Sequence, residues 1–169
     1  MGFSVHQLAF SSSNYPPYAR FPVLKGKISG LESIGLHSAD TQGIDFYEVQ
    51  VTTTDVFVQD QLIDGVDILK IDTEGNDARV LIGSLHTIST KKPKLIMFEN
   101  HFIGHWKNIS LQDVVDILDN LSYTCFWAAG DGALFQITSC WDPFYDIKTW
   151  SNVLCSDRKD EKIGQIIKK

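Results

Sequence analysis

The segment from Asp67 to Gly75 constrains the fold of this chain more than any other. Ile68, Leu69 and Ile71 make a short, nearly continuous apolar run, which is typical of a parallel strand covered on both faces. Parallel strands are joined by long crossover connections, usually helices. The segment therefore predicts an α/β fold, and the acidic residues and glycine after it predict a turn into the next helix.

Strand and helix patterns alternate on both sides of this segment. Strands are predicted at 46–51, 67–71 and 94–99, helices at 56–62, 77–88 and 111–121, and a strand hairpin at 123–129 and 133–138. The turn Gly130-Asp131-Gly132 is short enough to require antiparallel pairing of the last two strands. We expect an α/β sheet that is mostly parallel, with an antiparallel C-terminal hairpin.

The N-terminal part of the chain carries weaker patterns. Residues 3–10 alternate loosely between apolar and polar types, which predicts a strand. Residues 16–45 hold several glycines and no sustained period, which predicts a long loop, with at most a short hairpin. The chain after Trp141 shows no regular pattern, and residues 156–169 are expected to form a polar tail.

Length, charge and hydropathy exclude several classes of protein. With 169 residues and 43% hydrophobic content, the chain is expected to form a single domain over residues 1–169. Its net charge of -6, without a basic stripe, argues against a nucleic-acid partner. No apolar run approaches the roughly 20 residues of a membrane-spanning helix, and no compartment signal is readable.

The cysteines do not indicate a metal or disulfide framework. There are three of them, at 125, 140 and 155, an odd number without a Cys-x-x-Cys pair. We therefore expect unpaired thiols. Two glycosylation acceptor patterns, at Asn108 and Asn120, are too short to fix the compartment.

Acidic and imidazole side chains follow two neighbouring predicted strands. Asp72 and Glu74 come after the strand that ends at Ile71, and Glu99 and His101 follow the next strand. Ligands bind at the carboxyl ends of parallel strands, so we expect these groups to lie close together in one site. They can orient or deprotonate a hydroxyl. The alternative is that the acidic pair only braces the turn.

Other polar and aromatic residues have structural interpretations that compete with functional ones. His101 and His105 would share a helix face as metal ligands, but the surrounding composition favours a surface loop. A metal-assisted enzyme using Asp72, Glu74 and His101 stays an open alternative, although no metal site is predicted. Lys70 is expected to pack its stem and expose its amine. Three tryptophans offer a stacking wall or, more commonly, packing: Trp106, Trp141 and Trp150.

The segment Asp67–Gly75 resembles the signature of the FkbM methyltransferase family, a Lys-Ile-Asp-x-Glu-Gly run. Further family segments are similar to Val51–Asp55, Val80–Gly83 and Phe98-Glu99, and the resemblance covers about residues 3–155. It implies a class I, Rossmann-like methyltransferase sheet that transfers a methyl group from S-adenosylmethionine to an oxygen. The implied acceptor is a small-molecule or glycan hydroxyl, on a sugar or natural product.

The resemblance also implies roles for individual residues. Asp72, Glu74 and His101 would be catalytic, near the transferred methyl group. Glu99 and Trp106 would contact the acceptor. No residues for the cofactor are assigned, because the glycine-rich turn that the family carries on its first strand is absent from the sequence, as is the acidic residue that holds the ribose.

This departure predicts a domain truncated at its N-terminus. We expect the chain to bind S-adenosylmethionine weakly on its own, and to self-associate through a sheet edge that the missing strands would leave uncovered. The competing interpretation is a non-catalytic remnant of the fold that binds a carbohydrate or a protein partner.

Overall fold

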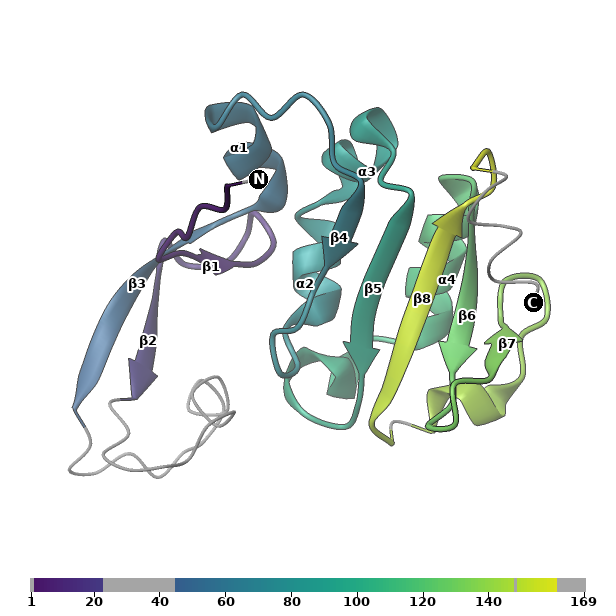
Figure 1. Cartoon of the computed structure of the whole chain (residues 1–169). Helices are drawn as coiled ribbons and strands as arrows, with labels where there is room; N and C mark the ends of the chain where they lie inside the picture. The colour runs from purple at the N-terminus through teal and green to yellow at the C-terminus, as the bar shows by residue number, and fades with distance from the viewer. Residues whose placement is uncertain (1, 23–44, 148, 161–169) are drawn as a thin grey trace.

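The computed structural model describes residues 2–22, 45–147 and 149–160. They form two sheets with helices, so the predicted α/β class is confirmed. Figure 1 shows the smaller sheet beside the free edge of the larger one. The smaller sheet has the order β1-β3-β2, and its strands are β1 (Ala9–Phe10), β2 (Tyr18–Pro22) and β3 (Phe46–Thr52).

The larger sheet has five strands in the order β4-β5-β8-β6-β7. They are β4 (Ile68–Lys70), β5 (Leu95–Asn100), β6 (Tyr123–Ala128), β7 (Leu134–Gln136) and β8 (Ser151–Asp157). Only β4 and β5 pair in parallel, and the other three pairings are antiparallel. The β6–β7 hairpin is confirmed, whereas the prediction of a mostly parallel sheet is wrong for the described strands.

Strand β8 accounts for this difference. It comes from the segment after Trp141 that we predicted to be irregular, and it inserts between β5 and β6, antiparallel to both. Ser156 and Asp157 are buried members of β8, so the predicted polar tail begins too early. Residues 161–169 lie outside the described part of the chain.

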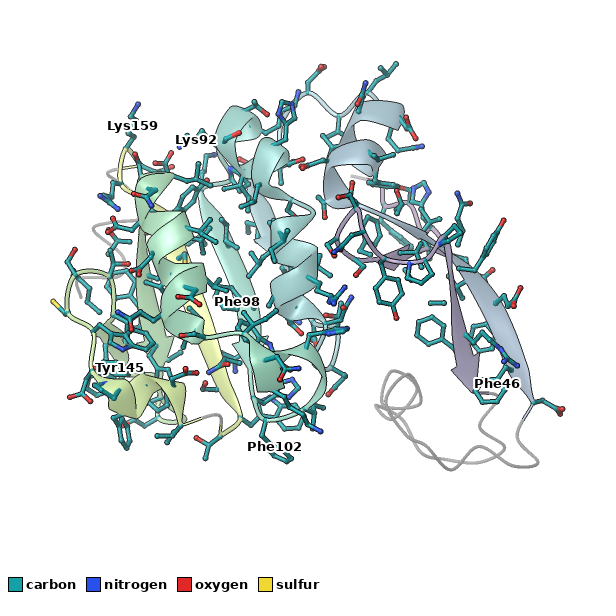
Figure 2. The ribbon with its side chains drawn as sticks, turned by 180° about the vertical axis from the view of Figure 1, so that it is seen from behind. Phe46, Lys92, Phe98, Phe102, Tyr145 and Lys159 are labelled. Carbon is teal, nitrogen blue, oxygen red and sulfur yellow. A yellow bond between two sulfur atoms is a disulfide. The ribbon has the colours of Figure 1, made fainter. Side chains whose placement is uncertain are left out.

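Three helices cover one face of the larger sheet: α2 (Asp77–Ile82), α3 (Leu85–Lys91) and α4 (Leu111–Asn120). In Figure 1 they all lie behind the sheet, and in Figure 2 they lie in front of it. The core lies between these layers and includes Phe98, Leu111 and Val153. Ile68, on β4, is 59% exposed. The prediction that this strand is covered on both faces is therefore wrong, because no helix of the described chain covers the opposite face.

The helix predicted at 77–88 is divided in two at Gly83. The Gly83 carbonyl accepts a hydrogen bond from the Asp55 N–H (3.0 Å), and a Cβ at Gly83 would lie 2.2 Å from the Ser11 carbonyl oxygen. The Asp55 carboxylate then accepts the N–H groups of His86 and Thr87 (3.1 and 2.7 Å) in the first turn of α3. The break thus connects α2 and α3 to the N-terminal segments.

The N-terminal elements differ in extent from the prediction. Of the strand expected at 3–10, only Ala9–Phe10 pairs, because the described chain offers earlier residues no partner strand. Part of the expected loop 16–45 is strand β2, which pairs antiparallel with β3, and residues 23–44 lie outside the described part. Helix α1 (Thr54–Asp60) is capped by Thr53, whose hydroxyl accepts the Val56 N–H.

Two of the three cysteines form a disulfide, so the expectation of unpaired thiols is wrong for them. Cys125 on β6 and Cys155 on β8 lie directly opposite each other in the sheet, and both are fully buried. Cys140 is an exposed free thiol. The pairing follows from the position of β8, which the sequence pattern did not indicate. Within the described residues, no helix is long and apolar enough to cross a membrane.

Candidate functional site

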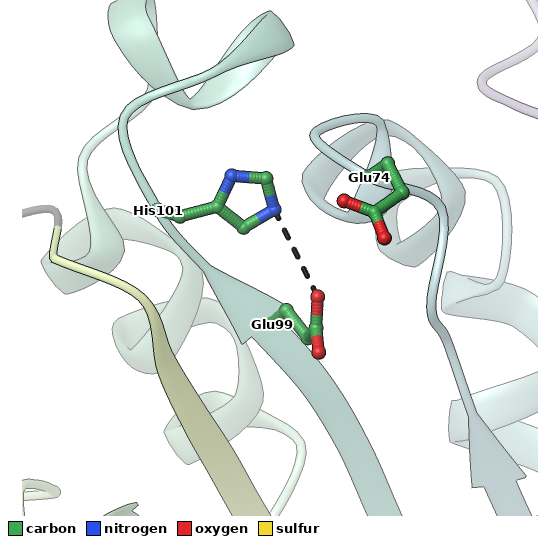
Figure 3. A group of neighbouring side chains, drawn as sticks. All are labelled: Glu74, Glu99 and His101. Atoms are coloured by element: carbon green, nitrogen blue, oxygen red, sulfur yellow. Dashed lines mark ion pairs between the residues drawn. The ribbon is translucent and has the colours of Figure 1, made fainter. Parts of the chain in front are cut away.

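The carboxyl ends of β4 and β5 lie side by side, and the acidic residues gather there. Glu74, Glu99 and His101 place one ligand atom each within 4.8 Å of one another, and Figure 3 shows the three side chains facing a common space. The predicted proximity of these three groups is thus confirmed. It arises because the two strands are parallel neighbours whose ends meet at one edge of the sheet.

Two glycines fix the loops that carry these groups. Gly75 (φ 102°) directly follows Glu74, whose own φ is 49°. Gly104 (φ 61°) lies at the end of the loop after β5 and begins the next 3-10 helix. The Gly75 carbonyl accepts the His105 N–H at 2.8 Å, and a Cβ at Gly104 would lie 2.5 Å from that carbonyl oxygen. Left-handed backbone and close contact together require glycine at both positions. The β4–α2 turn is therefore held against the loop that follows His101.

The Asp77 carboxylate connects the β4–α2 turn to β5 through hydrogen bonds. Its Oδ2 accepts the Gly75 N–H (3.3 Å) and the Thr73 hydroxyl (3.0 Å), while Oδ1 accepts the Glu99 N–H (3.3 Å). Its side chain is fully buried. We had considered Asp72 and Glu74 as braces of this turn, but Asp77 performs that role. The sequence signal was only an acidic residue at the start of the helix predicted at 77–88.

Burial and charge distinguish the members of the cluster. His101 is 1% exposed, and its Nε2 lies 3.9 Å from Glu99 Oε2, beyond hydrogen-bonding distance. Burial raises the pKa of Glu74 above its usual value, the charge of Glu99 raises it further, and His101 partly lowers it. The His101 ring stacks on Trp150 with centroids 5.5 Å apart. His101 is therefore not the surface-loop residue that we predicted.

Asp72 lies apart from this cluster. Its Oδ2 accepts a hydrogen bond from Lys70 Nζ at 2.5 Å, both side chains are largely exposed, and this bond is the main cause that raises the pKa of Lys70. The exposed amine of Lys70 agrees with the prediction. Asp72 and Thr73 line two adjoining cavities of about 240 and 480 Å³, neither of which is lined by Glu74, Glu99 or His101. The predicted single site is thus divided into a cavity side and a cluster side.

The tryptophans do not form a common wall. Trp106 is fully buried and stacks on Phe98, with centroids 6.0 Å apart, so it is a core residue and does not reach an external ligand. Trp141 packs on Tyr145, and only Trp150, 63% exposed, borders the cluster. His105 lies in the short 3-10 helix η2 (Gly104–Asn108) and is not part of the cluster.

Comparison with known protein families gives one match. The family described as the Methyltransferase FkbM domain matches residues 7–125, which is more than two thirds of the chain. The matched region contains the ends of β4 and β5 that carry the site, with Asp72, Glu74, Glu99 and His101. No curated protein and no solved structure matches the chain.

Proposed function

Because this chain belongs to the FkbM methyltransferase family, we propose that it takes part in methyl transfer from S-adenosylmethionine to the oxygen of a hydroxyl group on a sugar or natural product. The observation that carries the proposal is the family match over the segment where Asp72 borders two cavities beside the acidic cluster. That position, at the carboxyl ends of two parallel strands, is where α/β proteins bind small molecules.

Asp72 is the residue we assign to the acceptor. Its carboxylate is exposed at the junction of the two cavities, so it can accept a hydrogen bond from an acceptor hydroxyl and take up its proton. Lys70 holds the carboxylate in place through their hydrogen bond. Glu74 and His101 are the further candidates, and they act from the cluster side of the same turn.

The described residues fit S-adenosylmethionine only in part. The larger cavity, of about 480 Å³, has a volume within the range of small-molecule sites, and its apolar walls, including Phe57, Leu69 and Val80, suit a purine ring. Among the described lining residues, however, no glycine permits a close backbone approach. When bound, S-adenosylmethionine would supply an electrophilic methyl group.

This partial fit supports one expectation: the chain alone should bind S-adenosylmethionine weakly, as the sequence predicted. The second candidate function, a non-catalytic module that binds a carbohydrate or a protein partner, stays a prediction. Self-association through the free edge of β4 stays a prediction, supported by the exposure of Ile68 on that strand.

A methyl-transfer assay tests the proposal. It uses the whole chain, radiolabelled S-adenosylmethionine at millimolar concentration and a panel of hydroxyl acceptors. Asp72→Asn should reduce transfer by roughly 100-fold or more, the contribution typical of a general base. Asp116→Asn, at an exposed position on α4, is the matched control and should keep the wild-type rate. Transfer unaffected by Asp72→Asn would contradict the assigned role.

Calorimetry separates the two candidate functions. Weak cofactor binding together with Asp72-dependent transfer supports the enzyme. The absence of both binding and transfer at millimolar S-adenosylmethionine would reject methyl transfer by this chain and leave the binding module. Tight, stoichiometric cofactor binding would contradict the partial fit.

A further inference from the structure

The cluster of Glu74, Glu99 and His101 has the geometry of a cation site. One carboxylate oxygen from each glutamate and one imidazole nitrogen lie within 4.8 Å of one another. Ligands that are about 2.0–2.2 Å from a metal ion lie at most roughly 4.4 Å apart, so small side-chain rotations bring all three donors onto one ion. In Figure 3 the three side chains converge from the β4–α2 turn, from the end of β5 and from the loop after it.

Buried donor atoms without partners are the independent observation. His101 is 1% exposed, and among the described residues neither its Nε2 nor Glu99 Oε2 has a hydrogen-bond partner. Leaving such groups unsatisfied costs free energy, and buried polar atoms of this kind call for a specific explanation. The 3.9 Å separation of the two atoms is too long for a hydrogen bond between them. An ion bound between them would satisfy both.

The surrounding charges agree with an ion of charge two. Two carboxylates face one imidazole, and the lysine on the adjoining strand, Lys70, is hydrogen-bonded to Asp72 instead. Asp77 already accepts three hydrogen bonds, from Gly75, Thr73 and Glu99, so it positions the ligands and is not one of them.

We propose that Glu74, Glu99 and His101 bind one first-row divalent cation such as Mn²⁺. Carboxylate oxygens with an imidazole suit the harder and borderline ions of this row. Three protein ligands leave coordination positions open for water or for a ligand hydroxyl, as in catalytic metal sites. The proposal goes beyond methyl transfer and does not depend on it, because it concerns binding of the ion itself.

Mn²⁺ titration followed by electron paramagnetic resonance tests the site in the whole chain, without S-adenosylmethionine or an acceptor. Mn²⁺ is chosen because it binds the free thiol of Cys140 poorly. We expect one bound ion per chain, with nitrogen coupling from a coordinated imidazole in the pulsed spectrum. Glu74→Gln and Glu99→Gln should each weaken binding roughly 10-fold or more, and His101→Ala should abolish the nitrogen coupling.

Glu48→Gln and His86→Ala are the matched controls, because both residues are exposed and neither belongs to the cluster. They should bind Mn²⁺ like the wild type. Glu74 is only partly buried, so Glu74→Gln should fold even if the buried substitutions do not. Thermal unfolding then decides: Mn²⁺ should raise the Tm of the wild type and not that of Glu74→Gln.

Three results would overturn the proposal: equal Mn²⁺ affinity in wild type and Glu74→Gln, nitrogen coupling that persists in His101→Ala, or no bound Mn²⁺ at millimolar concentration. Because no methyl donor is present, none of these results bears on the methyl-transfer assay.

Discussion

At the scale of single residues, Asp77 links the two segments that carry the acidic cluster, the β4–α2 turn and β5. It is the only side chain among the described residues that accepts hydrogen bonds from both the β4–α2 turn and β5. Glu74 and Glu99 belong to those two segments, so their distance depends on Asp77. A buried carboxylate that satisfies several backbone and hydroxyl donors stabilises the fold chiefly by preventing those donors from being left unpaired.

Asp77→Ala should therefore lower the free energy of unfolding by about 2–4 kcal/mol, since it leaves one buried and two partly buried donors without their acceptor. Urea denaturation measures the change. Asp116→Ala, at an exposed position of α4, should stay within about 0.5 kcal/mol of the wild type. An equally small effect of Asp77→Ala would show that water replaces the carboxylate.

The sequence predicted the residues that carry the chemistry better than those that hold them. Asp72, Glu74, Glu99 and His101 were identified because acidic and imidazole groups after apolar strands are visible locally. The separation of Asp72 from the other three was not, because it depends on which way each side chain points from its turn. The role of Asp77 was missed since its partner Glu99 is distant in sequence.

At the scale of elements, the break at Gly83 joins the N-terminal segments to the helical layer. The Gly83 backbone contacts Ser11, next to β1, and its carbonyl accepts the N–H of Asp55 in α1. A continuous helix at this position would remove both contacts. The glycine is thus required by close packing between elements, although helical periodicity continues through it in the sequence.

Gly83→Ala should lower the free energy of unfolding by about 1–3 kcal/mol, the usual cost of overpacking. The Cβ of the new alanine would collide with the backbone of Ser11. Gly65→Ala is the matched control, since nothing lies within 4 Å of a Cβ there. It should be neutral or slightly stabilising. Equal thermal stability of the two variants would show that the contact with Ser11 relaxes at no cost.

Local signals explain which elements were predictable. The β6–β7 hairpin and helix α4 have a short turn and a capping serine, and both were predicted from neighbouring residues. Strand β8 has no such signal, and its place is set by pairing with β5 and β6, which come much earlier in the chain. The strand and helix patterns predicted the α/β class, and the family resemblance agreed with it, but neither indicated the position of this strand.

At the scale of the whole molecule, the Cys125–Cys155 bond connects the last described strand to the sheet. It closes a loop with a sequence separation of 30 residues. By the loop-entropy relation, such a crosslink stabilises a fold by about 3–4 kcal/mol. This contribution is a substantial share of the roughly 5–15 kcal/mol that keep a domain folded.

The double substitution Cys125→Ala with Cys155→Ala should lower the free energy of unfolding by about 3 kcal/mol or more. Cys140→Ser, which removes the exposed thiol, is the control and should leave stability unchanged. Denaturant titration under non-reducing conditions measures both. Alkylation of the native wild type should label a single cysteine, and labelling of all three would contradict the disulfide.

The same bond determines what a protease can release. The exposed turn Gly130–Gly132 lies inside the loop that the disulfide closes. A single cut there separates the chain into two polypeptides that stay covalently joined through Cys125 and Cys155. A nicked molecule would therefore migrate as one species on a non-reducing gel and as two fragments after reduction.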